Sequence, residues 1–308
     1  MPTDAVTGAT SYTGRFIAAQ LAERGRDVIN LTRRPSTGLA GASVTRTIPF
    51  PPDGVDGRDA LAHSLQDVDT LYNTHWIRFE RGERTYRWAI TTIETLLTAA
   101  RRAGVRRVVH ISVVHASHDA PTAYFRAKAE AEDAVASLAE SHAIVRPTVT
   151  FGPGDILVNN LAWTLRHLPV FGIPGDGRYP IQPVHVADIA RIAVEAGEAT
   201  ADLVVDAAGP ETFEFHDFVE TVRRAVGSRA IVVHLPVPIA LTGAGLIGLV
   251  VRDAVLRRDE VTELKARLMI SDEAPLGTIS FRGWVSEHAG ELGRHWSSEL
   301  DRHYRSSR

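Results

Sequence analysis

Apolar and polar positions alternate in blocks along the chain, with short aliphatic runs followed by longer segments that have helical spacing. The first run is Ala5-Val6-Thr7, and the segment after it places Phe16, Ile17 and Leu21 on one helical face. Apolar runs of about 4–8 residues between turn residues are typical of buried strands, whereas a 3.6-residue repeat is typical of helices. The pattern therefore predicts strands that alternate with helices.

This alternation favours an α/β fold with a doubly wound parallel sheet (a Rossmann sheet) and helices on both faces. The Gly- and Pro-rich residues 170–177 are expected to form a loop. Further strands are expected at 27–32, 43–48, 68–72, 107–112, 203–207 and 231–235. Further helices are expected at 58–65, 83–103, from 123 onward, and at 188–196, 215–226, 260–269 and 287–305.

The length of 308 residues is enough for a large α/β domain with an appended lobe. We expect residues 1–155 to form the domain that contains the doubly wound Rossmann sheet, to which residues 178–210 return. Residues 156–177 and 211–308 are expected to form a smaller C-terminal lobe that binds the substrate.

The turn after the first strand carries the strongest signal for a ligand. Gly8 allows the chain to leave the strand in a tight turn, and Gly14 has no side chain to separate helix from strand. The free N–H groups at the helix start attract an anion, so a dinucleotide pyrophosphate is expected there. Ser11 replaces an expected middle glycine, and it either contacts phosphate or restricts its approach. The expected cofactor-binding residues of this turn are Gly8, Thr10, Ser11, Tyr12, Thr13 and Gly14.

The second strand indicates which dinucleotide is bound. An acidic residue at its carboxyl end binds a ribose 2′-hydroxyl, whereas arginine accommodates a 2′-phosphate. Asp27 begins this strand, and Arg33 and Arg34 follow its end. The cofactor is therefore expected to be NADP(H), with NAD(H) as the alternative. Thr74, at the carboxyl end of the strand at 68–72, is a further expected cofactor contact, and His75 is expected to line the pocket.

Tyr124 and Lys128 lie four residues apart in a strongly helix-forming segment, so they share one helical face. A nearby ammonium lowers the pKa of a phenol, which makes tyrosine usable as a general acid or base. Such a pair alone is common on ordinary helices.

Together with the N-terminal turn, this pair resembles the short-chain dehydrogenase/reductase superfamily, in its extended or atypical branch. That branch contains NAD(P)-dependent epimerases and dehydratases and NAD(P)H-binding proteins, and the sequence is similar to the nucleotide-binding accessory subunit of respiratory complex I. The resemblance covers about residues 3–196. Its further matches are His110-Ile111-Ser112, Arg146-Pro147-Thr148, Phe151-Gly152-Pro153-Gly154-Asp155 and Val184-His185-Val186-Ala187-Asp188.

The resemblance implies that Tyr124 is the acid/base and that Lys128 is its partner and a contact of the nicotinamide ribose. It also implies that Pro147 and Thr148 line the nicotinamide side. The active serine or threonine of the family usually stands where this chain has Val113. Ser112 then replaces it as a catalytic residue, or Ser117 does, or no hydroxyl serves.

Two functions follow from this resemblance. The first is an NADP(H)-dependent oxidoreductase or an epimerase/dehydratase-like enzyme that acts on a small molecule. The second is a non-catalytic NADPH-binding sensor or assembly protein, which Val113 favours. We expect a monomer or a homodimer.

Composition limits the other classes of function. Cysteine is absent, which excludes disulfides and thiolate catalysis, and no residue cluster has metal-ligand spacing. A net charge of −3 and scattered basic residues argue against a nucleic-acid surface. The apolar stretch 235–251 is interrupted by Pro and Gly, so it is expected to form a buried or partly exposed helix without a membrane span, with membrane-surface contact as the alternative. Because the first strand starts within a few residues, leaving no room for a signal peptide, we expect a cytoplasmic location.

Overall fold

A computed structural model describes residues 2–32, 44–51 and 54–304. The chain divides into two compact units: Met1–Pro147 with Val186–Ala207, and Thr148–His185 with Ala208–Arg308. The sequence had placed 148–155, 178–185 and 208–210 in the first domain, whereas the structure groups them with the second. The difference arises because β7 (Val149–Phe151) pairs with β10 (Pro183–His185) outside the large sheet.

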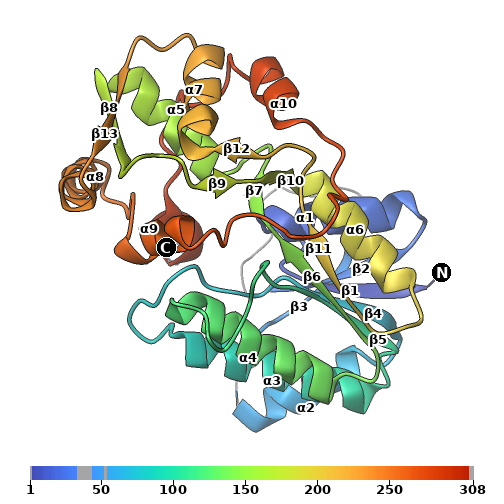
Figure 1. Ribbon diagram of the computed structural model, residues 1–308. Coiled ribbons are helices and arrows are strands. Elements are labelled where there is room, and N and C mark those ends of the chain that lie inside the picture. Colours follow the sequence, from blue (N-terminus) through green and yellow to red (C-terminus); the bar gives the residue numbers. More distant parts are fainter. Residues whose placement is uncertain (1, 33–43, 52–53, 305–308) are drawn as a thin grey trace. The chain divides into compact units, whose positions relative to one another are not determined.

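The first unit is built on a seven-stranded parallel sheet with the order β11-β6-β5-β4-β1-β2-β3 (Figure 1). This arrangement confirms the predicted doubly wound α/β fold. The strands are β1 (Thr3–Thr7), β2 (Asp27–Leu31), β3 (Val44–Ile48), β4 (Val68–Asn73), β5 (Arg107–Ile111), β6 (His142–Pro147) and β11 (Leu203–Ala207).

Helices cover both faces of this sheet, with α2, α3 and α4 on one face and α1 and α6 on the other (Figure 1). Burial on both faces explains why the central strands are continuous apolar runs rather than alternating ones. The helices are α1 (Tyr12–Glu23), α2 (Gly54–Ser64), α3 (Tyr86–Ala103), α4 (Ala123–Leu138) and α6 (Val186–Glu198). Gly104 ends α3 in the left-handed conformation, which glycine adopts readily at the end of a helix.

The second unit combines short strand pairs with helices around an aromatic core that includes Phe151, Phe218, Phe281 and Trp284. Its remaining strands are β8 (Val170–Pro174), β9 (Pro180–Ile181), β12 (Phe213–Glu214) and β13 (Ile231–Leu235). Its helices are α5 (Leu157–His167), α7 (Phe215–Ala225), α8 (Val237–Val251), α9 (Arg258–Lys265), α10 (Phe281–Glu287) and α11 (Glu299–His303).

Two predictions for the second unit were wrong. Residues 170–174 form strand β8, because β13 pairs with it in parallel and supplies backbone partners that a loop would lack. Gly172 allows this approach, since a Cβ there would lie 2.5 Å from Leu235 Cδ1. Of the single helix expected at 287–305, only α11 forms, because Gly293 has φ +71° and packs against the backbone of Ala162. Helix α10 ends where the expected helix would begin.

Candidate functional site

The turn between β1 and α1 brings two backbone segments unusually close. Gly8 has φ +64°, its N–H donates to Leu31 O (2.9 Å), and its carbonyl accepts from Ser11 N (2.7 Å). A Cβ on Gly14 would lie 2.1 Å from Gly8 O and 2.8 Å from Gly8 C. Any side chain at residue 14 would therefore force helix and turn apart.

The start of α1 is electrically open to an anion. Ser11 is the N-cap and its side chain makes no capping hydrogen bond, while the first turn of the helix contains no acidic residue. Ser11 is exposed, whereas Thr10, Tyr12 and Thr13 are half-buried around it. Unsatisfied N–H groups and the helix dipole favour negative charge at this position. The turn can thus hold a pyrophosphate.

The neighbouring strand β2 contributes an amide to the same region. Asn30, fully buried, accepts a hydrogen bond from Ala9 N through Oδ1 (2.8 Å). Asp27 lies at the start of β2, opposite Thr3, at the end of the strand away from the turn. Arg33 and Arg34, predicted to select the 2′-phosphate, lie outside the described residues.

A buried polar network fastens the carboxyl ends of β1 and β4. Thr74 N donates to Thr7 Oγ1 (2.6 Å), and Thr74 Oγ1 donates to Thr7 O (2.5 Å). Asn73 accepts from Thr7 Oγ1 (3.2 Å) and lies 2.9 Å from His110 Nδ1 through Nδ2. Thr74 therefore has a structural role besides its predicted cofactor contact.

Both histidines at this edge are held neutral. Burial lowers the pKa of His75 to about 4 and that of His110 well below its ordinary value. The Asn73 amide can only donate to His110 Nδ1, which places the proton on Nε2. Among the described residues His110 Nε2 has no hydrogen-bond partner. The sequence did not predict the contact between Asn73 and His110, because His110 is one polar residue within a largely apolar strand.

Lys128, on α4, is only 3% exposed. Its Nζ donates to Ile111 O (3.0 Å) and lies 4.3 Å from the centroid of the Trp76 ring. Burial lowers the pKa of Lys128 from its ordinary value to about 7. Trp76 lies in the segment that follows β4, and nothing in the spacing of Tyr124 and Lys128 predicts that an indole covers the ammonium group.

Tyr124 is half-buried in an aromatic cluster formed with Trp76 and Tyr86. Its ring centroid lies 6.2 Å from that of Trp76 and 6.1 Å from that of Tyr86, edge to face in both cases. Trp76 and Tyr86 stack on each other at 6.1 Å. Tyr124 and Lys128 thus both contact the same indole.

The sequence model of the NAD dependent epimerase/dehydratase family matches residues 5–206, which span the turn, Tyr124 and Lys128. The chain belongs to this family. This membership confirms the resemblance stated from the motifs.

The relatives of this chain include subunits of a respiratory enzyme. The chain is 25% identical to NADH dehydrogenase (ubiquinone) 1 alpha subcomplex subunit 9 of Arabidopsis thaliana, over 87% of this chain and 71% of that protein. It is 27% identical to the 40 kDa subunit of NADH-ubiquinone oxidoreductase of Neurospora crassa, over 84% and 69%.

Solved structures of similar fold include enzymes of sugar nucleotides. MoeE5, in complex with UDP-glucose and NAD, aligns with TM-score 0.66 and 18% identity over 94% of this chain and 98% of that one. UDP-N-acetylglucosamine 4-epimerase from Bacillus cereus aligns with TM-score 0.64 and 14% identity over 96% and 100%. At this identity the likeness shows the fold alone.

The hydroxyl expected in this family has no direct counterpart here. Val113 is half-buried at the usual position, and Ser112 is buried with Oγ unpartnered among the described residues. Ser112 N donates to Val145 O (2.7 Å), which holds the residue in the extension of β5. Ser117 is exposed and its Oγ accepts from Asp119 N, so its hydroxyl braces a turn.

The predicted nicotinamide-side residues fall at the division between the units. Pro147 ends β6 and pairs with Ala207 in the first unit. Thr148 begins the second unit and is buried, with Oγ1 unpartnered among the described residues.

No helix in the described part of the chain is long and apolar enough to cross a membrane.

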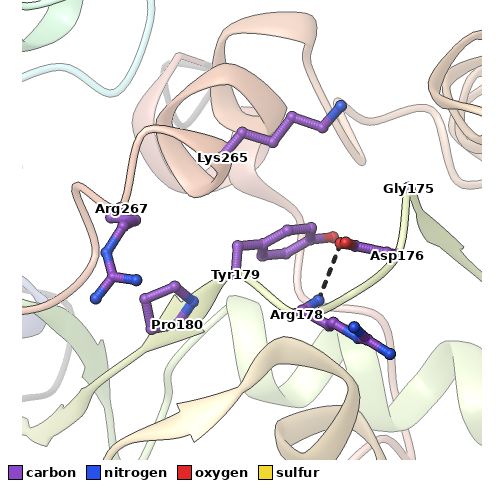
Figure 2. A pocket seen from close by; sticks show the side chains of 7 residues that line it. All are labelled: Gly175, Asp176, Arg178, Tyr179, Pro180, Lys265 and Arg267. Carbon is purple, nitrogen blue, oxygen red and sulfur yellow. Dashed lines mark hydrogen bonds between the residues drawn. The ribbon is translucent and has the colours of Figure 1, made fainter.

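The second unit contains an open hollow of about 530 Å³ that the sequence did not predict (Figure 2). Asp176 Oδ1 accepts from Arg178 N (3.1 Å) at its edge. The lining residues come from segments about ninety positions apart, so no local sequence pattern predicts that they lie together. They are Gly175, Asp176, Arg178, Tyr179, Pro180, Lys265 and Arg267.

Proposed function

We propose that this protein binds a nicotinamide dinucleotide against the turn between β1 and α1, with NADP(H) preferred to NAD(H). The observation that carries the proposal is the close approach at Gly14, where a Cβ would lie 2.1 Å from Gly8 O. This close packing of helix and turn leaves the N-terminal N–H groups of α1 facing outward. A turn whose backbone comes near a pyrophosphate needs such close packing. Family membership over residues 5–206 supports the same ligand.

We further propose that the protein is an oxidoreductase or epimerase of small molecules in which Tyr124 moves the proton. When bound, the nicotinamide supplies or accepts the hydride. In a carbonyl reduction the Tyr124 hydroxyl would donate its proton to the substrate oxygen. Lys128 then stabilises the phenolate through its positive charge, one helical turn away on α4. Ser112, which precedes Val113 in the sequence, would supply the hydroxyl.

A second candidate function, a non-catalytic NADPH-binding sensor or assembly protein, is favoured by one contact. The Trp76 ring lies 4.3 Å from Lys128 Nζ, and the amine already donates to Ile111 O. A lysine covered in this way must be uncovered before it can meet a ribose. The similarity to respiratory-complex subunits supports this alternative.

One pair of measurements tests both candidates. Calorimetric titration with NADPH and NADH reports binding, and NADPH oxidation with a panel of aldehydes and ketones reports turnover. The Tyr124→Phe variant is carried through both, because phenylalanine keeps the ring contacts with Trp76 and Tyr86.

Turnover in the unmodified protein that disappears in Tyr124→Phe, with unchanged NADPH affinity, supports the enzyme. Tight NADPH binding without turnover on any substrate, and without a change in Tyr124→Phe, supports the sensor. Absence of binding to either dinucleotide would overturn both candidates.

A further inference from the structure

Helix α8 presents an apolar face that the rest of its unit leaves open. Ile239, Leu246, Leu249 and Val250 are 56%, 62%, 77% and 79% exposed. These positions are 7, 3 and 1 residues apart, so at about 100° per residue they share one side of the helix. Within α8, which is described over its full length, only Ala240 and Ala244 are buried.

This face offers a partner no polar group. Thr242 is the sole polar side chain of the helix, and its hydroxyl already donates to Pro238 O (2.9 Å). No charged residue occurs from Leu235 to Val251. Protein–protein interfaces carry about one hydrogen bond per 100–200 Å² and have polar rims. A helical face of this composition fits hydrocarbon better than it fits a polar protein surface.

Cationic side chains flank both ends of α8. Arg252, the left-handed C-cap, is exposed directly after the apolar face, and Arg258 is exposed at the start of α9. At the other end, Gly175 N donates to Leu235 O (2.7 Å), two residues before α8 begins. Gly175 belongs to a hollow that is lined by three cationic side chains, Arg178, Lys265 and Arg267, and by one anionic side chain, Asp176 (Figure 2). The charges that border the apolar helix therefore suit anionic head groups.

We propose that α8 docks the protein onto the surface of a bilayer containing anionic lipids. Its four exposed aliphatic side chains enter the boundary between head groups and acyl chains, and the flanking arginines contact the head groups. The helix has 15 residues and so measures about 22 Å, which is shorter than the roughly 30 Å hydrocarbon core. It therefore lies in the plane of the interface, where binding is reversible.

Vesicle co-sedimentation of the full chain tests this proposal. The probes are phosphatidylcholine vesicles and phosphatidylcholine vesicles that contain about a third phosphatidylglycerol, a fraction sufficient for a negative surface. We expect the unmodified protein to bind the anionic vesicles. The double variant Leu246→Ser/Leu249→Ser should lower the partition coefficient at least about tenfold. Two aliphatic side chains that would enter the membrane are lost without a change in charge.

The matched control is the double variant Val170→Ser/Ile231→Ser. These residues are exposed register partners on β8 and β13, outside α8. This control should bind vesicles as the unmodified protein does. Arg252→Gln/Arg258→Gln should weaken binding to anionic vesicles by about fivefold per arginine and leave neutral vesicles unaffected. Circular dichroism melts establish that each variant is folded.

Failure of the folded, unmodified protein to bind anionic vesicles would overturn the proposal. Equal loss of binding in the β8/β13 control would overturn it as well, since α8 would then have no special role. Concentration-dependent self-association that disappears in Leu246→Ser/Leu249→Ser, without vesicle binding, would instead assign the face to a protein interface.

Discussion

The turn at Gly8–Gly14 and the pair Tyr124–Lys128 are the two regions that a short sequence motif singles out. They differ in the atoms that make them. The turn is made of backbone, and its geometry depends on a missing Cβ at residue 14. The pair is made of side chains, and one of them, Lys128, is covered by a third side chain, Trp76.

This difference shows which structural features a short sequence motif can predict. Glycine spacing specifies a backbone path almost by itself, because only glycine fits where the Cβ would meet Gly8 O. The i,i+4 spacing of Tyr124 and Lys128 specifies a shared helical face and nothing about what covers it. The covering residue lies about fifty positions earlier, at the end of another strand.

Gly14→Val should have the largest effect, since it attacks the backbone site directly. The branched side chain cannot coexist with Gly8 O at 2.1 Å from its Cβ, so NADPH binding should be abolished while the fold survives. Calorimetric titration with NADPH checks the result. Gly290→Ala is the matched control, because a Cβ there meets nothing within 4 Å. Unchanged affinity in Gly14→Val would show that the dinucleotide binds elsewhere.

Tyr124→Phe tests the side-chain site. If Tyr124 is the acid/base, the rate of hydride transfer should fall by about 10²–10⁴, the usual contribution of a positioned proton donor. NADPH affinity should barely change because the ring remains. Tyr86→Phe removes a hydroxyl from the same aromatic cluster and should keep most of the rate. An equal fall in both variants, measured in single-turnover NADPH oxidation, would argue for a packing role.

Arg33→Ala tests which dinucleotide the protein prefers, a property that the turn itself does not specify. A charge-assisted hydrogen bond to the 2′-phosphate is worth about 1.5–3 kcal/mol, so the preference for NADPH over NADH should shrink about ten- to hundredfold. Competition binding with both cofactors measures the ratio. Arg102→Ala, an exposed arginine on α3, should leave it unchanged. Equal affinity of the unmodified protein for both cofactors would contradict the expected selectivity.

Lys128→Met should have the smallest effect, a change in how stability depends on pH. It tests the burial of the amine beneath the Trp76 ring. The pKa of Lys128 is about 7 in the folded protein, whereas an unfolded lysine has about 10.4. Between these values the unfolded state binds more protons, so stability should rise with pH from about 7 to about 10. Chemical denaturation at several pH values should show this slope, and Lys128→Met should reduce it. Trp76→Ala should also flatten the slope by admitting water to the amine, whereas Trp76→Phe should preserve it. An identical slope in Lys128→Met would contradict the buried, low-pKa lysine.

Much of the fold follows from local chemistry along the chain. The apolar runs of the central strands, the glycine that ends α3 and the spacing in the β1–α1 turn predict the doubly wound sheet and the place of the cofactor. These features depend on residues within one or two turns of each other, whose backbone preferences survive in any tertiary context. The family resemblance rests on the same local motifs.

The remaining features depend on contacts between distant segments. Residues 170–174 become a strand because β13 pairs with them, and Gly293 breaks a helical pattern because it packs on Ala162. The hollow beside α9 brings together cations from two segments about ninety positions apart. The pKa of Lys128 likewise depends on burial by residues that no helical spacing could indicate. Desolvation and packing act through space, so these properties were decided only when the chain folded.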